Sequence, residues 1–139
     1  MSIELSYQTP LKLKHVKRIK QLLNDIASLE GHTISNLSVV FTSDEYLIDL
    51  NRTYLNHDYY TDIITFDYSS VEDSRTIFGE LYISVDRANE NANLLNIPNY
   101  NEYMRLMIHG ILHLCGYKDN TPEAKALMTA KENQYLSLL

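Results

Sequence analysis

The sequence has few of the residues that mark flexible linkers or disulfide frameworks. Its 139 residues include only four glycines, three prolines and one cysteine. So little Gly and Pro argues against long linkers. The lone Cys115 cannot form an intramolecular disulfide, and its default role is that of a small buried hydrophobic residue.

Segments that would direct the chain to a membrane are also lacking. The N-terminus has no basic start followed by an apolar stretch, and no apolar run approaches the roughly 18 residues of a membrane span. We therefore expect a cytoplasmic protein without a membrane partner. A chain of 139 residues fits one domain, residues 1–139, in which roughly two-thirds of the unfolded surface is buried.

Positive charge is scarce, since the formal net charge is −6. This balance weakens any bulk electrostatic attraction to nucleic acid, and no DNA partner is expected. Five of the twelve basic residues nevertheless fall within nine positions, and they form the one candidate RNA-binding surface: Lys12, Lys14, Lys17, Arg18 and Lys20. The alternative is that this run is only the solvated face of an amphipathic helix.

Hydrophobic periodicity predicts an α+β fold. Alternating apolar residues indicate strands over 3–7, 34–42, 62–68 and 76–85. Helical spacing and capping residues indicate helices over 10–30, 43–54, 86–95, 99–115 and from Pro122 to the C-terminus, and the second of these is capped by Ser43 or Asp44. Four strands and about five helices in this order predict one small mixed sheet packed with helices. The helix over 99–115 is the most apolar and is expected to be central.

His109 and His113 lie on that helix and are the strongest functional signal in the chain. Residues four apart share a helical face, so two imidazoles can bind one metal ion. The flanking residues are apolar on nearly all sides, and burial keeps imidazole in the neutral form that a metal requires. The alternative is a pair of core histidines that only form hydrogen bonds.

Asp119 is the candidate for the third metal ligand. Gly116 lets the chain leave the helix, so Asp119 can fold back toward His113. Asp119 is not needed as a helix cap, because Thr121 and Pro122 already provide one. His57 is the main competitor for the third ligand position.

The zinc protease pattern H-E-x-x-H carries its general base directly after the first histidine, where this chain has Gly110. A base would have to come from another segment, and Glu80 is a tentative candidate, although a Glu in a strand is more often solvated or structural. Arg105, one turn before His109, could reach a phosphate or merely cover the helix.

The run His109-Gly-Ile-Leu-His113-Leu-Cys-Gly-Tyr117 closely resembles the H-G-x-L-H-L-x-G-Y motif of the YbeY family. Three further segments are similar to that family in the same order: Leu50-Asn51 with Tyr54 and residues 61–66, residues 78–84, and Met128 with Glu132. The resemblance implies a zincin-like α+β fold. It also implies a bacterial metal-dependent, single-strand-specific endoribonuclease of rRNA maturation, acting at the 3′ end of 16S rRNA and in ribosome quality control. Implied partners are rRNA and the ribosomal small subunit or its proteins.

Two departures from the family pattern affect the chemistry. The family usually continues G-Y-D-H, with the second His as third ligand, whereas this chain places Asp119 at that position. One Zn2+ per chain is the first choice. A carboxylate lowers the charge of the site and makes harder metals better tolerated, so Fe2+, Mn2+ or Ni2+ are alternatives. The second departure is Leu55, which stands where the family usually has an Arg.

Three functions remain open at this point. The first is the endoribonuclease, with Tyr54, Tyr59 and Tyr60 as possible stacking partners for unpaired bases. The second is a ribosome assembly factor that binds RNA and uses its metal mainly for structure. A small metalloprotease is the third, and Gly110 weakens it.

Overall fold

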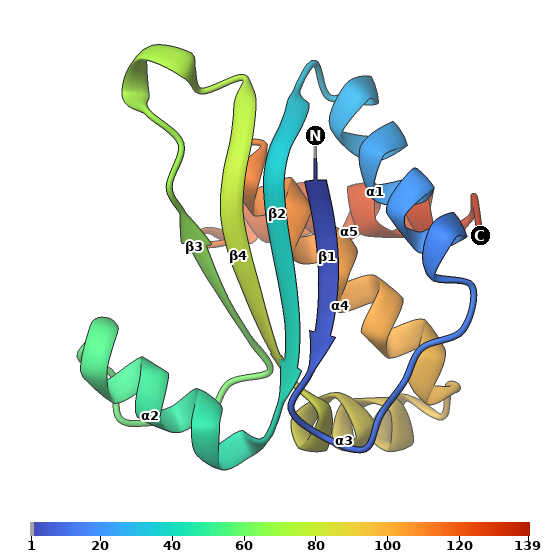
Figure 1. Cartoon of the computed structure of the whole chain (residues 1–139). Helices are drawn as coiled ribbons and strands as arrows, with labels where there is room; N and C mark the ends of the chain where they lie inside the picture. The colour runs from blue at the N-terminus through green and yellow to red at the C-terminus, as the bar shows by residue number, and fades with distance from the viewer. Residues whose placement is uncertain (1) are drawn as a thin grey trace.

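The computed structural model describes residues 2–139, which contain five α-helices and one four-stranded sheet (Figure 1). This confirms the predicted α+β class. The strands are β1 (Ser2–Tyr7), β2 (Thr33–Thr42), β3 (Ile63–Asp67) and β4 (Thr76–Ser84). The helices are α1 (Val16–Leu29), α2 (Asp44–Tyr54), α3 (Val85–Leu95), α4 (Asn99–Leu114) and α5 (Pro122–Leu136), and a short 3-10 turn spans Val71–Asp73.

The sheet is mixed, as predicted, with strand order β1-β2-β4-β3. β1, β2 and β4 run parallel, whereas β3 pairs antiparallel with β4, with Ile63 opposite Ile83 and Asp67 opposite Gly79. β3 is therefore an edge strand. Its outer side is free to border a cleft.

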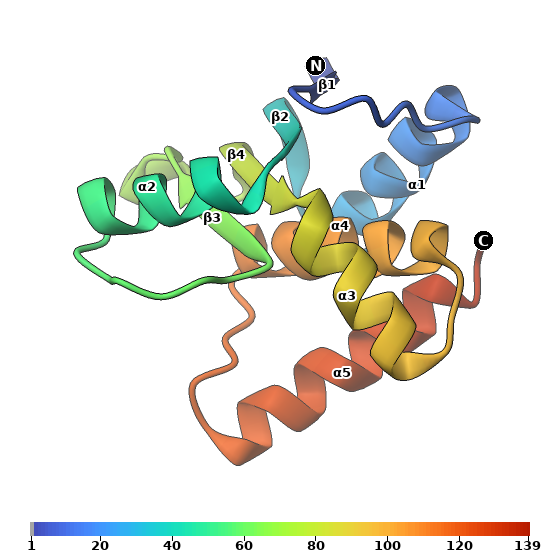
Figure 2. The ribbon, with the colours of Figure 1, turned by 90° about the horizontal axis from the view of Figure 1, so that it is seen from below.

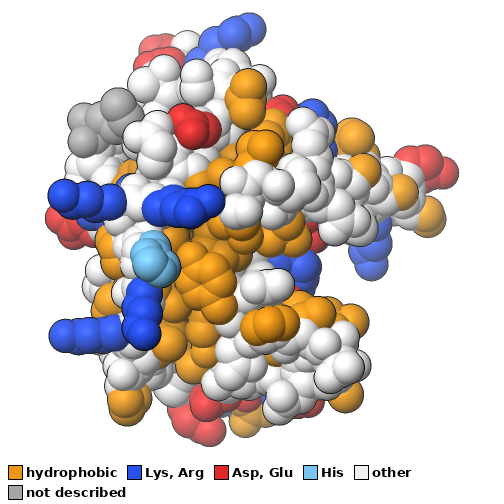
Figure 3. All heavy atoms as spheres, turned by 90° about the vertical axis from the view of Figure 1, so that its right-hand side faces the viewer, with side chains coloured by type: hydrophobic (Ala, Val, Ile, Leu, Met, Phe, Trp, Pro, Cys, Tyr) orange, Lys and Arg blue, Asp and Glu red, His pale blue; other side chains and the backbone are white. Residues whose placement is uncertain are grey.

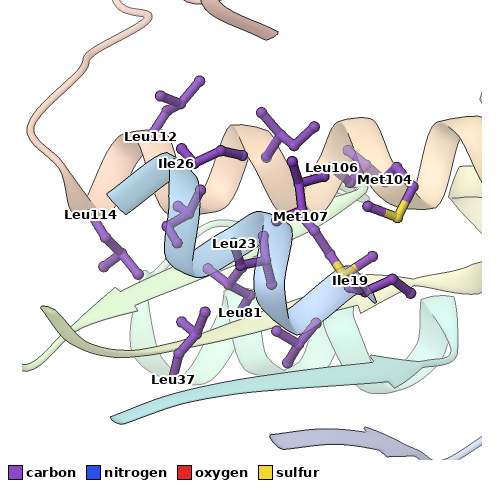
Figure 4. Packing of buried hydrophobic residues seen from close by; sticks show 14 of the residues in the cluster. Ile19, Leu23, Ile26, Leu37, Leu81, Met104, Leu106, Met107, Leu112 and Leu114 are labelled. Atoms are coloured by element: carbon purple, nitrogen blue, oxygen red, sulfur yellow. The ribbon is translucent and has the colours of Figure 1, made fainter. Parts of the chain in front are cut away.

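α4 lies at the centre of the helical layer. It contacts α1, α3 and α5 as well as β3 and β4, and ten of its 16 residues are buried, so the prediction of a central histidine helix is confirmed. Figure 4 shows how apolar side chains of α1, α4 and the sheet fill the space between them. α2 lies on the other sheet face, where the Tyr46 ring stacks on Tyr82 with centroids 6.2 Å apart. Its start contacts α3 through the 2.8 Å ion pair of Asp44 with Arg87, whereas Figure 2 shows it away from α4 and α5.

The first helix begins six residues later than predicted, at Val16 instead of Pro10. Residues 8–15 instead form an irregular segment in which Leu11 and Leu13 pack against the core. The physical reason is topological: β1 and β2 are parallel, so the chain must cross from the end of β1 into the helical layer before it can turn back. Lys12 and Lys14 consequently lie outside the helix.

Local capping signals were predicted well. Ser43 accepts a hydrogen bond from the Tyr46 amide at 3.2 Å and starts α2, and Thr121 accepts one from the Ala124 amide at 3.0 Å and starts α5. Both contacts satisfy an amide that has no partner inside its helix. None of the helices within residues 2–139 combines the length and apolar character that crossing a membrane requires.

Candidate metal centre

His109 and His113 face each other on the last two turns of α4. Their Nε2 atoms are 3.0 Å apart, and the ring planes cross at 80°. The side chains are 17% and 27% exposed, so both rings are held by protein on one side and reach an open space on the other.

The second nitrogen of each ring is held by a different part of the chain. His109 Nδ1 lies 2.5 Å from a Glu132 carboxylate oxygen on α5, and His113 Nδ1 lies 2.9 Å from the Tyr117 carbonyl oxygen. A carbonyl and an ionised carboxylate only accept hydrogen bonds, so each Nδ1 carries the proton and donates it. Each Nε2 is therefore left with a free lone pair, which is the state that binds a metal.

Asp119 completes this group because the chain turns sharply after α4. Gly116 adopts a φ of 103°, and a side chain is strained in this left-handed region. The turn brings Asp119 Oδ2 to 3.4 Å from His109 Nε2 and 3.3 Å from His113 Nε2.

The three groups could hold one metal ion, since their ligand atoms all lie within 4.8 Å of one another. Two imidazole lone pairs and a carboxylate oxygen repel one another unless a cation lies between them. The donor set therefore fits a divalent metal, and two nitrogens with one oxygen suit zinc as well as iron or manganese.

An open cleft of about 460 Å³ leads to these groups. It is bordered by the end of α4, by strand β3 and by the segment between α2 and β3, including Leu55 and His57. His57 lines the cleft with its Nδ1 3.0 Å from the Tyr59 hydroxyl, but it is not one of the three clustered groups. The cleft is open to solvent.

Glu80 cannot act as a base at this site, which corrects the expectation from the sequence. Side chains alternate along a strand, and Gly79 and Leu81 face α4. Glu80 therefore points to the opposite face of the sheet, where it accepts a 2.7 Å hydrogen bond from the Tyr68 hydroxyl. This contact with Glu80 raises the pKa of Tyr68 to about 12.

Arg105 does not reach the cleft and is occupied elsewhere. Its guanidinium lies 2.6 Å from the fully buried Glu102 carboxylate and 3.2 Å from Glu132. The hydrogen bond to Glu102 is the main cause that raises the pKa of Arg105. Arg105 thus balances the charge of two buried acids and is not free to bind phosphate.

The basic residues predicted as an RNA surface lie away from the metal centre. None of Lys12, Lys14, Lys17, Arg18 and Lys20 is among the residues that line the cleft. α1 packs against β2 and α4, whereas the cleft borders β3 on the far side of β4. Figure 3 shows Lys and Arg side chains, with a His, on the face of the molecule at the α1 side.

Glu132 contacts the candidate metal centre in a way that the sequence reasoning did not predict. It is 4% exposed, holds His109 and pairs with Arg105. The sequence did carry a signal: Glu132 belongs with Met128 to the last segment that resembles the family, and the two lie four residues apart on one face of a helix. Its partner lies 23 residues away and was not visible in the pattern.

Comparisons with known proteins agree with the fold. The sequence profile described as "Endoribonuclease YbeY" matches residues 4–139. A relative named endoribonuclease YbeY from Cytophaga hutchinsonii is 47% identical over 94% of this chain and 90% of its own length. Another of that name, from Phocaeicola vulgatus, is 40% identical over 97% and 98%.

A solved structure is also similar. The solution structure of TM1509 from Thermotoga maritima aligns with a TM-score of 0.66 at 25% identity, covering 98% of this chain and 87% of that one. Its agreement spans nearly every element described above. By profile and by relatives, this chain belongs to the endoribonuclease YbeY family.

Proposed function

We propose that this protein is a metal-dependent endoribonuclease that cleaves single-stranded RNA during rRNA maturation, including the 3′ end of 16S rRNA. The observation that carries the proposal is the convergence of two unprotonated Nε2 atoms and one carboxylate oxygen at the base of an open cleft. Membership in the endoribonuclease YbeY family supports RNA as the substrate.

His109, His113 and Asp119 would hold the ion, with zinc as the first choice and Fe2+, Mn2+ or Ni2+ as alternatives. A divalent ion bound there would polarise a phosphoryl oxygen and acidify water. Glu132 and the Tyr117 carbonyl orient the two rings, since each accepts the Nδ1 proton. Asp119 is 43% exposed, so its carboxylate faces the side from which substrate arrives.

The general base must come from the cleft, because Glu80 lies on the other sheet face. Besides the three proposed ligands, three groups that line the cleft can accept a proton: His57, Asp62 and Asp67. Each of the three already has a hydrogen-bond partner: Asp62 accepts from Asn91, Asp67 accepts from Ser69, and His57 Nδ1 lies 3.0 Å from the Tyr59 hydroxyl. We place the base within this set.

The wider setting is proposed on the same grounds. The protein would act in the cytoplasm as one domain, on rRNA and in contact with the ribosomal small subunit. The basic residues of segment 12–20 would touch the RNA backbone at a distance from the cut, because they do not line the cleft.

The test combines metal analysis with cleavage of rRNA fragments by wild type, His113→Ala and Asp119→Asn. Exposed Glu123→Gln on α5 serves as the matched control. We expect both site variants to lose metal and to cleave more than about 100-fold more slowly, beyond what loss of an orienting contact costs. Equal cleavage by His113→Ala, with contaminating nuclease excluded, refutes the proposal.

The same variants distinguish the endoribonuclease from the alternative function, a ribosome assembly factor whose metal is mainly structural. That function has one feature in its favour: Leu55 lines the cleft where the family pattern has an Arg. It predicts RNA binding without cleavage, together with unfolding when the metal is removed.

A further inference from the structure

A nearly buried carboxylate lies behind the metal centre, on the side away from the cleft. Glu30 follows the last residue of α1, and its side chain is 11% exposed. It accepts hydrogen bonds from the Tyr117 hydroxyl at 2.6 Å, from Lys131 Nζ at 3.2 Å and from the Tyr135 hydroxyl. Glu30 thus ties the end of α1 to the turn after α4 and to α5.

One of these contacts leads directly to a histidine of the metal centre. Tyr117 donates its hydroxyl proton to Glu30, and its backbone carbonyl accepts the Nδ1 proton of His113 at 2.9 Å. Tyr117 also lies two residues before Asp119, within the turn that follows Gly116. Holding the Tyr117 ring therefore fixes the turn that orients His113 and carries the carboxylate.

The contact between Glu30 and Lys131 leads through α5 to His109. Lys131 binds Glu30, and the next residue, Glu132, binds His109 Nδ1 at 2.5 Å. Lys131 also lies over the Tyr117 ring, with its Nζ 5.8 Å from the ring centroid. Of two consecutive residues of α5, Lys131 therefore contacts the groups behind His113, and Glu132 contacts His109. Figure 2 shows α5 alongside α4.

Glu30 is held in its charged form by these partners. Burial by itself raises the pKa of Glu30, but the hydrogen bonds from Tyr117, Tyr135 and Lys131 outweigh burial and leave the pKa lowered. Charged acceptors form stronger hydrogen bonds than neutral ones, so the anion restrains the two tyrosines more firmly than an amide would.

We propose that Glu30 is a positioning residue of the metal centre, which holds the Tyr117 turn and α5 so that metal binding and the docking of α5 are coupled. The inference rests on the proposed metal centre and adds a residue distant from the cleft. It concerns geometry alone, because Glu30 touches none of the three ligand side chains.

The test compares wild type, Glu30→Gln and the exposed control Glu123→Gln on the same protein. The dissociation constant for Co2+ is measured by chelator competition, the ligand field by the visible absorption of the Co2+ form, and folding by circular dichroism. We expect Glu30→Gln to stay folded, to bind Co2+ about 10-fold more weakly, at the low end of what losing an orienting group costs, and to show an altered Co2+ spectrum. Glu123→Gln should match wild type in all three.

Two further measurements keep the inference refutable if Glu30→Gln does not fold. Tyr117→Phe removes only the hydroxyl link and must also weaken Co2+ binding. Hydrogen exchange of the α5 amides in wild type must slow when Co2+ is added. Wild-type affinity and spectrum in folded Glu30→Gln, or in Tyr117→Phe, overturn the inference alone. Unchanged Co2+ affinity in His113→Ala overturns the metal centre itself and the inference with it.

Discussion

Replacing Gly110 by alanine tests how closely the histidine helix lies on the sheet. Gly110 lies between the two candidate ligands, on the side of α4 that faces β3 and β4. A Cβ atom there would come within 2.7 Å of both Leu81 methyl carbons and 3.1 Å from Ile63 Cδ1. Leu81 is fully buried, so its methyl groups cannot move aside without disturbing the core. A protease-type Glu at this position would clash with the same side chains.

Two opposing effects set the change in the free energy of unfolding that Gly110→Ala causes. Alanine is favoured over glycine inside a helix by about 1 kcal/mol. Forcing an extra methyl group into a packed core costs about 1–3 kcal/mol. Because both contacts with Leu81 are shorter than real Cβ contacts, we take the upper half of that range. The net expectation is a loss of about 1–2 kcal/mol in the free energy of unfolding.

Urea unfolding of the metal-free proteins measures this difference directly. The matched control is a double-mutant cycle with Leu81→Ala, which alone should cost about 2–5 kcal/mol. In the Leu81→Ala background the added methyl group has room, so Gly110→Ala should become neutral or stabilising. A gain of about 1 kcal/mol for Gly110→Ala in the wild-type background, as at an exposed helical glycine, would refute the close packing.

Two other changes test residues on either side of the sheet. Glu132→Gln should weaken Zn2+ binding about 10- to 100-fold, because the amide orients the His109 ring less well than a carboxylate does. A chelator titration measures the affinity. An unchanged value would show that Glu132 only balances the charge of Arg105. Glu80→Gln should leave metal content unaltered and let the pKa of Tyr68 fall from about 12 toward the ordinary value near 10, since the neutral amide no longer favours the protonated phenol. NMR titration of ring-labelled tyrosine follows that pKa, and loss of metal in Glu80→Gln would contradict the position of Glu80 on the far sheet face.

Local pattern was enough for much of the fold. Strand alternation, helical spacing and the caps Ser43 and Thr121 depend on neighbours within a few residues, and so the elements from β2 to α5 lie close to their predicted bounds. The same holds for the histidine pair, whose four-residue spacing is itself a helical period. The start of α1 was misplaced because it depends on the crossover between parallel strands and not on local preference.

The sequence by itself determined the α+β class, the family and the three residues proposed as ligands, because their spacing and motif are read along the chain. Only the tertiary structure decided which side chains orient these three residues. Glu30 contacts Tyr117 across 87 residues of sequence, and Glu132 contacts His109 across 23. Glu80 lies outside the site because strand alternation points its side chain to the other face of the sheet. Such contacts follow from how α1, α4 and α5 pack together, and packing depends on the whole chain at once.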